Sequence, residues 1–438
     1  MHIFKGCKFV SPLQQHLHTP KLRVFFLSIF LRFLLKGLFI YCSHSFIQHF
    51  IPKNVYIYLF FPVLSLVCVL LGISLIMMLD GCRSSSEPWV LLGSAGIPIW
   101  DWTSVCVVMS FTVLQVALYY LPVGQVTEGK MGCDGKRLKY KLNGLHAFLL
   151  TVLLMLVLWF AGVLRAGAVM DSIFSLVTAA MAISLIFSLM LSCLCLCCTA
   201  KPLLEFVLGQ SMDPRLGIID VKHFVMVRVG FIGWAMMDVN YLLTAVEMKN
   251  SSLSLLLVII FQLIYILDFL IDEASVLTTK EFTDEPIGFI MILGEFIWIP
   301  FFSSLPVYFL LQRPNHIHFL SAVPICLLFG TGFLIYYLSN EQKDGFPHKC
   351  IPAGRSLLVS GWFGWVRHPN YSGDILMMFA WCLPCGFTSV LPYLPVLQCF
   401  NLLRQRANEI EESCLKKHRD AWREYCRRVP YKLLPYIY

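Results

Sequence analysis

Charged residues are scarce in this chain. Asp, Glu, Lys and Arg make up 14% of its 438 residues, whereas hydrophobic residues make up 58%. A soluble globular protein has about 25% charged residues. So much apolar surface excludes an ordinary soluble domain and requires lipid around the chain. The formal net charge of +8 is typical of Lys and Arg in the cytoplasmic segments of a membrane protein. Without a nucleic-acid-reading motif, we expect no direct nucleic-acid binding.

Several other patterns are missing as well. No Cys-x-x-Cys pair is matched by a second pair or by histidines at zinc spacing, so the 17 cysteines indicate neither a disulfide framework nor a metal site. We expect them to be small apolar residues, with palmitoylation of Cys197 or Cys198 as the alternative. The sequence shows no cleavable signal peptide, internal repeat or soluble domain.

The chain instead has a series of apolar runs of about 20 residues, the length that crosses a bilayer as a helix. The predicted spans are Val55–Leu79, Ser104–Leu121, Leu145–Leu164, Ile173–Cys195, Val225–Val246, Leu253–Ile271, Ile287–Leu311 and Ile317–Leu338. A further run, Ile375–Leu403, contains Pro384 and Pro392, which favours two half-helices in a hairpin over one straight helix. We therefore predict an all-α, multi-pass transmembrane bundle.

The polar segments predict how the chain is divided. Residues 1–54 form a basic N-terminal segment, in which the apolar stretch 24–40 contains Arg32 and Lys36 and predicts a helix lying on the membrane surface. Residues 55–438 form the transmembrane domain. Within it, Ser339–His368 and the tail Arg404–Tyr438 are polar and basic, so the positive-inside rule places both in the cytoplasm.

The densest polar motif is Gly361–Asp374, with the sequence GWFGWVRHPNYSGD. Its Arg and His suit phosphate, its Asn and Tyr give directional hydrogen bonds, and its Trp residues offer stacking faces. A juxtamembrane belt of aromatic and basic residues is the alternative. The tail mixes Arg with aromatic residues, which fits an adenine-and-phosphate pocket, although a solvated amphipathic helix is the simpler interpretation of its charges. The sequence thus predicts a functional centre in the C-terminal third.

Ionisable residues inside predicted spans are further candidates, because burying them in lipid is costly. Asp238 lies in one span, and Tyr265 and Asp268 lie in the next. A tyrosine hydroxyl in such a cavity can donate a proton. Alternatively, the hydroxyl of Tyr265 only finds a hydrogen-bond partner within the bundle.

These motifs resemble the sterol C14- and C7-reductase family, which includes delta-14-sterol reductases and the membrane part of lamin B receptor. The similarity runs from about Leu118 to Tyr438, through LYYLPVGQVTEGK, FVLGQSMDPR, QLIYILD, VLTT, LLVSGWFGWVRHPNYSGD and YCRRVPYKLLPYIY. The resemblance implies a bundle of about ten transmembrane helices with a C-terminal cytoplasmic pocket for NADPH. It also implies reduction of the C14–C15 double bond of a sterol that enters from the membrane lipid. The implied location is the endoplasmic reticulum membrane, continuous with the inner nuclear membrane.

The resemblance also implies site residues. Tyr265, in QLIY, matches a family tyrosine proposed as proton donor, and Asp374 is a second candidate catalytic residue. The matching cofactor positions are Lys343, Leu358, Asn370, Tyr371, Arg406, the run from Cys414 to His418, and Tyr425. NADPH is the implied cofactor, and no metal is implied.

The chain departs from the family pattern at several motifs. Pro347 stands where the family has an Arg after the Gln-Lys pair, and Phe363 replaces the second Trp of GWWG. Other departures are Glu409-Ile410-Glu411 for Arg-Asp-Glu, Asp272-Glu273-Ala274 for His-Glu-Glu, and Met226 and Val229 for a Glu and a Pro. A lost phosphate-binding Arg weakens cofactor binding by about 1.5–3 kcal/mol.

These departures leave other hypotheses open. The main alternative is a catalytically impaired anchor of the nuclear envelope or endoplasmic reticulum, related to lamin B receptor. That receptor carries an additional N-terminal region that reads chromatin. Residues 1–54 are too short for it, so the sequence does not support lamina or chromatin partners. An isoprenylcysteine methyltransferase, which binds S-adenosylmethionine, has a distantly similar C-terminal motif, but the QLIY and VLTT stretches argue against it.

Overall fold

The protein is mostly helical. The computed structural model describes residues 100–131, 137–194, 202–345 and 358–435, together with Leu75, Ile76 and Leu79, all within one unit, Leu75–Tyr438. The predicted surface helix at 24–40, most of the predicted span Val55–Leu79, and Cys197 and Cys198 lie outside the described residues.

Six helical runs of the described chain are long and apolar enough to cross a membrane. They are Trp102–Tyr119 (α5), Ile173–Leu194 (α8), Val221–Glu247 (α10 Val221–Phe224, η1 Val225–Ile232 and α11 Gly233–Glu247), Leu253–Ile271 (α12), Phe289–Gln312 (α14 Phe289–Leu293, η3 Gly294–Phe302 and α15 Leu305–Gln312) and Phe319–Asp344 (α16). A shorter apolar helix is Gly144–Phe160 (α6). Each coincides with a predicted span to within a few residues. The expected bundle of apolar helices is therefore confirmed for this part of the chain.

Polar residues at the helix starts help to set these boundaries. The side chain of Asp101 accepts a hydrogen bond from the backbone N–H of Ser104 at 3.2 Å and so caps α5. Ser252 caps α12 in the same way, through the N–H of Leu255 at 3.2 Å. Each cap satisfies an N–H group that has no partner within its helix.

The predicted C-terminal hairpin is confirmed. Helix α17 (Pro369–Cys382) is joined through the short helices η5 (Leu383–Cys385) and η6 (Leu391–Tyr393) to α18 (Leu394–His418). Proline cannot donate a backbone hydrogen bond, and Gly386 adopts a φ of 71°, so the chain turns here. Helix α18 continues into the predicted tail without a break, and only α19 (Asp420–Arg428) is separate from it.

Two small hairpins depart from the all-α prediction. Strand β1 (Gln125–Met131) pairs antiparallel with β2 (Arg137–Leu142), and β3 (Arg215–Leu216) pairs with β4 (Ile219–Asp220). Both hairpins lie in connections between the predicted spans. The other short elements are α7 (Gly167–Asp171), α9 (Pro202–Leu208), η2 (Glu273–Thr278), α13 (Lys280–Thr283) and η4 (Gly361–Gly364).

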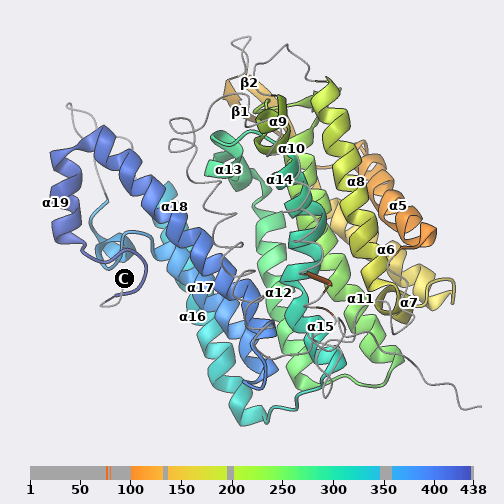
Figure 1. The fold of residues 1–438 in the computed structure, drawn as a ribbon. Coiled ribbons are helices and arrows are strands. Elements are labelled where there is room, and N and C mark those ends of the chain that lie inside the picture. The colour runs from red at the N-terminus through yellow and green to blue at the C-terminus, as the bar shows by residue number, and fades with distance from the viewer. Residues whose placement is uncertain are drawn as a thin grey trace, which may run out of the picture. The chain divides into compact units, whose positions relative to one another are not determined.

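Helix α12 lies between two groups of helices. Helices α16, α17 and α18 lie side by side, as Figure 1 shows, and α17 also packs on α12. On its other side α12 contacts α11 and α6, and α5 packs on α8 and α6. Any side chain of α12 that points towards α17 therefore meets the C-terminal hairpin.

Helices α16 and α17 approach closely at two glycines. A Cβ atom on Gly373 would lie 2.6 Å from the carbonyl oxygen of Gly332 and 2.6 Å from the backbone nitrogen of Tyr336. A Cβ on Gly332 would lie 2.9 Å from the nitrogen of Met377. Small residues at helix crossings allow backbones to come this near in membrane proteins. The contact fixes the start of α17, including Asp374, against α16.

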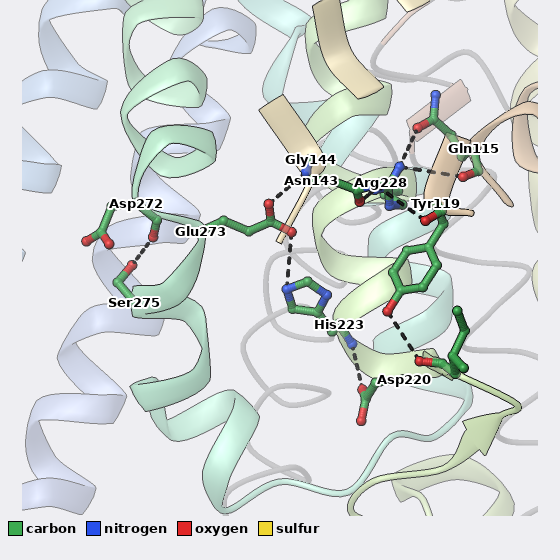
Figure 2. A network of polar contacts seen from close by, with 11 residues as sticks. Gln115, Tyr119, Asn143, Gly144, Asp220, His223, Arg228, Asp272, Glu273 and Ser275 are labelled. Carbon is green, nitrogen blue, oxygen red and sulfur yellow. Dashed lines mark hydrogen bonds and ion pairs between the residues drawn. The ribbon is translucent and has the colours of Figure 1, made fainter. Parts of the chain in front are cut away.

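A buried polar network joins the ends of several other helices (Figure 2). Glu273, which follows α12, accepts a hydrogen bond from the N–H of Gly144 at 2.7 Å and lies 3.3 Å from Nε2 of His223. Glu273 and His223 are only 4% and 1% exposed. The carboxylate therefore ties the first residue of α6 to α10.

Arg228 extends the same network into η1. Its guanidinium, fully buried, donates to the side chain of Asn143, the residue before α6, and to the side chain of Gln115 on α5 at 3.4 Å. It also lies 5.2 Å from the ring centroid of Tyr119. Buried polar groups are stable only when they are paired, so the network fixes how α5, α6, η1 and the end of α12 meet.

The glycine contact can be tested with two substitutions on one helix. Gly332→Ala should lower stability by about 1–3 kcal/mol, the usual cost of overpacking, because the added methyl meets backbone atoms of α17. In Gly330→Ala, the matched control, the methyl meets nothing within 4 Å. That variant should be neutral or up to about 1 kcal/mol more stable, because Ala favours helix. Thermal unfolding in detergent measures both, and equal midpoints for the two variants would contradict the contact.

The network also predicts a pH dependence. Burial raises the pKa of Glu273 to about 7, although the hydrogen bond from Gly144 and the charge of Arg228 oppose the rise. The folded state therefore holds this proton more tightly than the unfolded state, whose Glu pKa is about 4.3. The resulting stabilisation is complete at low pH and is lost as the pH rises towards 7.

Glu273→Gln removes this titration. Relative to the wild type, the variant should gain stability as the pH is raised from about 5 to about 7. Melting curves across this range, with the exposed Glu424→Gln as control, measure the difference. Parallel pH curves for wild type and Glu273→Gln would show that Glu273 has an ordinary pKa.

Candidate active site

Two residues that the sequence predicted to be catalytic lie against each other, although they are more than 100 positions apart. Tyr265 is on α12 and Asp374 is in the first turns of α17. The Tyr265 hydroxyl and the Asp374 carboxyl interact electrostatically where α12 packs on α17. Oδ1 of Asp374 has no hydrogen-bond partner among the described residues. An acid pair of this kind can hold and pass on a proton.

Aromatic rings surround the pair. The ring centroid of Tyr265 lies 5.6 Å from that of Trp381, 6.0 Å from that of Trp234 and 6.5 Å from that of Tyr336. These rings come from α17, α11 and α16. Trp234 is held in place because its indole N–H donates to Gln262, one turn before Tyr265, at 3.2 Å. The hydroxyl of Tyr265 thus sits in a largely apolar, aromatic environment.

The RHPNY part of the predicted motif forms the entry to α17. Pro369 is the first residue of the helix, where its missing N–H is not needed. The N–H groups of Arg367 and His368 donate to the carbonyls of Tyr431 and Lys432, each at 3.0 Å. The motif and the tail, predicted separately from the sequence, are therefore brought together.

Glu411 of α18 reinforces this junction. Its two carboxylate oxygens lie 2.9 Å from Nε of Arg367 and 2.9 Å from Nζ of Lys432. Arg367 also donates to the carbonyl of Val429 at 3.1 Å. Because Glu411 bridges two cations from different segments, the junction is both positively charged and ordered.

His368 has the most distinctive surroundings in the motif. It is buried, its ring stacks on Tyr371 with centroids 5.2 Å apart, and its Nε2 has no partner among the described residues. Burial lowers the pKa of His368 to about 4, and the charges of Arg367, Lys432 and Lys343 lower it further. A neutral imidazole beside three cations suits a negatively charged group.

The other cofactor positions on this side lie close to the motif. Asn370 donates to the side chain of Asn340 on α16 at 3.2 Å. Lys343 is exposed near the end of the same helix, and Leu358 is half-buried in the loop before η4. The structure thus places four predicted cofactor residues, Lys343, Leu358, Asn370 and Tyr371, around the junction of α16 and α17.

An open groove of about 540 Å³ runs beside Lys343. Its lining residues are Leu338, Glu341, Gln342, Gly361, Trp362 and Trp365. The side chain of Gln342 holds the turn that forms one wall, since it donates to the carbonyl of Ser360 at 2.8 Å and accepts from the N–H of Trp362 at 3.0 Å. Trp365 is 69% exposed, so its ring is available for stacking.

The predicted cofactor positions in the C-terminal tail have other neighbours. Arg406 pairs with Glu281 and lies 4.0 Å from Glu285, so its charge is directed at the segment around α13. Tyr425 and Cys414 belong to an apolar cluster with Trp422. Burial raises the pKa of Tyr425 to about 12. His418 is the last residue of α18.

The sequence predicted that His368, within the Gly361–Asp374 motif, suits phosphate, but only the fold reveals its unpartnered Nε2. The pair of His223 and Glu273 was not predicted. His223 was overlooked because a lone histidine in an apolar run carries no pattern. Its partner Glu273 is far away in the sequence, so the pair becomes visible only in the structure (Figure 2).

Comparisons with known proteins identify the family of this chain. The model of the ergosterol biosynthesis ERG4/ERG24 family matches residues 83–438. The chain is 40% identical to mouse "Delta(14)-sterol reductase TM7SF2" over 363 residues, which cover 78% of this chain and 87% of the relative. It is 31% identical to the "Delta(14)-sterol reductase" of Methylotuvimicrobium alcaliphilum over 344 residues, 74% of this chain and 81% of that protein.

A third relative is longer than the matching region. The chain is 36% identical to chicken "Delta(14)-sterol reductase LBR" over 359 residues, which cover 76% of this chain but only 56% of the relative. The family model matches far more than half of the chain, including both the Tyr265–Asp374 pair and the α16–α17 junction. This chain therefore belongs to the ergosterol biosynthesis ERG4/ERG24 family, the sterol reductases that its motifs resemble.

Proposed function

We propose that this protein is an NADPH-dependent delta-14-sterol reductase, which reduces the C14–C15 double bond of a sterol biosynthetic intermediate. The observation that carries the proposal is the meeting of Tyr265 on α12 with Asp374 on α17 inside the helix bundle, beside the rings of Trp381 and Trp234. The names of relatives at 30–40% identity support the same activity.

The pair supplies the acid for the reaction. When Asp374 carries a proton, it can donate to the oxygen of Tyr265, which makes the tyrosine hydroxyl more acidic. Tyr265 then protonates C15 of the alkene and leaves a cation at C14, the more substituted carbon. The rings of Trp381, Trp234 and Tyr336 around Tyr265 favour a nearby positive charge through cation–π interaction.

The α16–α17 junction suits the dinucleotide, which supplies a hydride to C14 when bound. Lys343 and the unpartnered Nε2 of His368 are placed to hold phosphate oxygens. The exposed ring of Trp365 and the stacked Tyr371 offer flat surfaces for the rings. We propose this junction, with Leu358 and Asn370, as the C-terminal cytoplasmic cofactor pocket.

The predicted cofactor positions in the tail have a structural role in this proposal. Arg406 is already paired with Glu281, and the cluster around Tyr425 and Cys414 packs α19 against the end of α18. We propose that they shape the pocket, with Arg406 able to contact a phosphate only by exchanging its carboxylate partner.

The membrane setting follows from the helices. We propose a bundle of about ten transmembrane helices in the endoplasmic reticulum membrane and the inner nuclear membrane continuous with it. The sterol enters the bundle from the lipid.

The alternative is a relative that has kept the fold and lost activity. One observation favours it: Arg406, a predicted phosphate ligand, is occupied by an acidic partner. An assay of purified protein in detergent distinguishes the two functions. The reductase hypothesis predicts oxidation of NADPH together with loss of the double bond of a delta-14 sterol. Failure both to bind and to oxidise NADPH would support the anchor.

Substitutions in the acid pair should affect turnover selectively. Tyr265→Phe should lower kcat by about 10²–10⁴-fold, the usual contribution of general acid catalysis, and leave NADPH affinity unchanged. Asp374→Asn should have a similar but smaller effect, because Tyr265 keeps its hydroxyl. Tyr337→Phe, an exposed neighbour on α16, is the matched control. An unchanged rate in Tyr265→Phe would remove this residue from the mechanism.

Substitution of Lys343, by contrast, should change the affinity for NADPH and not the turnover. Lys343→Ala should weaken NADPH binding by about 1.5–3 kcal/mol, the range for a charge-assisted hydrogen bond, with little effect on kcat at saturation. Lys139→Ala, which removes an exposed lysine on β2, should bind normally. Titration of NADPH followed by fluorescence measures both constants. Equal affinities for the two variants would place the phosphates elsewhere.

A further inference from the structure

The proposed acid pair needs a new proton after each reduction. Each reduction removes one proton from Tyr265 and Asp374, and both residues lie within the apolar helix bundle. A second turnover requires a new proton from water. In membrane proteins, chains of ionisable residues commonly carry protons to such sites. Such a proton requires ionisable groups that connect the pair with the membrane surface.

One face of α12 carries such a chain. Tyr265, Asp268 and Asp272 follow one another at intervals of three and four residues, so they lie along one side of the helix with Cβ atoms about 5–6 Å apart. Tyr265 and Asp268 are half-buried, and Asp272, the C-terminal cap of α12, is exposed. The row therefore leads from the interior to the end of the helix.

Neighbouring helices confirm that the row faces the acid pair. Asp268 interacts electrostatically with Asp374 on α17 and with Asp272. Tyr336 on α16 interacts with Asp374 and with both of these aspartates. These carboxyl groups and the two tyrosines therefore lie within electrostatic range of one another where α17 packs on α12 and α16. The thiol of Cys399 on α18 is a further electrostatic neighbour of Tyr265 and Asp374.

The row is unlike a structural ion-pair network. Among the described residues, no ion pair includes Asp268, Asp272 or Asp374. By contrast, Glu411 at the tail junction and Glu281 and Glu409 near α13 each face a cation. A carboxylate without a cation in a membrane interior favours its protonated form. These acids are therefore suited to hold and transfer protons.

We propose that Asp268 and Asp272 form the proton supply line of the active site, an inference that rests on the proposed reductase function. As the C15–H bond forms, the O–H bond of Tyr265 breaks, and Asp374 returns a proton to the tyrosine oxygen. Asp268 then reprotonates Asp374, and Asp272 passes on a proton taken from water, with water molecules bridging the gaps. No electrons move along the row, because the hydride comes from the dihydronicotinamide.

The test separates the first turnover from later ones. Asp268→Asn in the full-length protein should keep the first, single-turnover reduction within about twofold of wild type, because the resident protons are already in place. Its steady-state rate should fall by at least about tenfold, and added formate buffer, a small proton donor, should partly restore it. Asp284→Asn, which removes an exposed carboxylate after α13, should match the wild type in both measurements.

The other possible results of these measurements would contradict the proposed proton pathway. A normal steady-state rate in Asp268→Asn would overturn the supply line while leaving the reductase function intact. An equal loss in the first and later turnovers, without rescue by formate, would show that Asp268 only positions its neighbours and would also overturn it. A folded wild-type protein that binds NADPH but reduces no delta-14 sterol would overturn the proposed function and the supply line together.

Discussion

The close contact between Gly332 and Gly373 is the constraint on which the candidate active site depends. Because neither glycine has a side chain, the backbones of α16 and α17 meet directly. Asp374 follows Gly373 in the sequence, and Tyr336 is one turn beyond Gly332, so the contact presents both residues to α12. Tyr265 on α12 completes the group. A larger residue at either glycine would push α16 and α17 apart and so separate Tyr265 from Asp374, although both residues would be unchanged.

The bundle handles its buried polar groups in two different ways. At the ends of α5, α6 and η1, Glu273 accepts from Gly144 and lies against His223, while Arg228 donates to Asn143, and these contacts fix the helices (Figure 2). On the face of α12, by contrast, Asp268 and Asp374 have no cationic partner among the described residues. An unpaired acid inside a membrane is costly and is therefore a candidate for function.

The sequence predicted the helices better than their contacts. Length and hydropathy determine a membrane-spanning helix locally, so the predicted spans agree with α5, α8, α12 and α16 to within a few residues, and the prolines correctly indicated the C-terminal hairpin. The β1–β2 hairpin was missed because polar strands at a membrane surface lack an apolar alternation. The family resemblance indicated Tyr265 and the polar motif indicated Asp374, but their proximity depends on the glycine contact that fixes α17 against α16. In the same way, the acidic partner of Arg406 could not be deduced from α18 alone.

The central claim is that Tyr265 and Asp374 deliver a proton to one carbon of the sterol while a hydride reaches the other. Isotope labelling of the product tests it most directly. With NADPH deuterated at the transferable position, the purified protein should place one deuterium at C14, and in heavy water it should place one solvent deuterium at C15. NMR of the product identifies both positions. A product without label from NADPH, or with solvent deuterium at C14, would contradict the account.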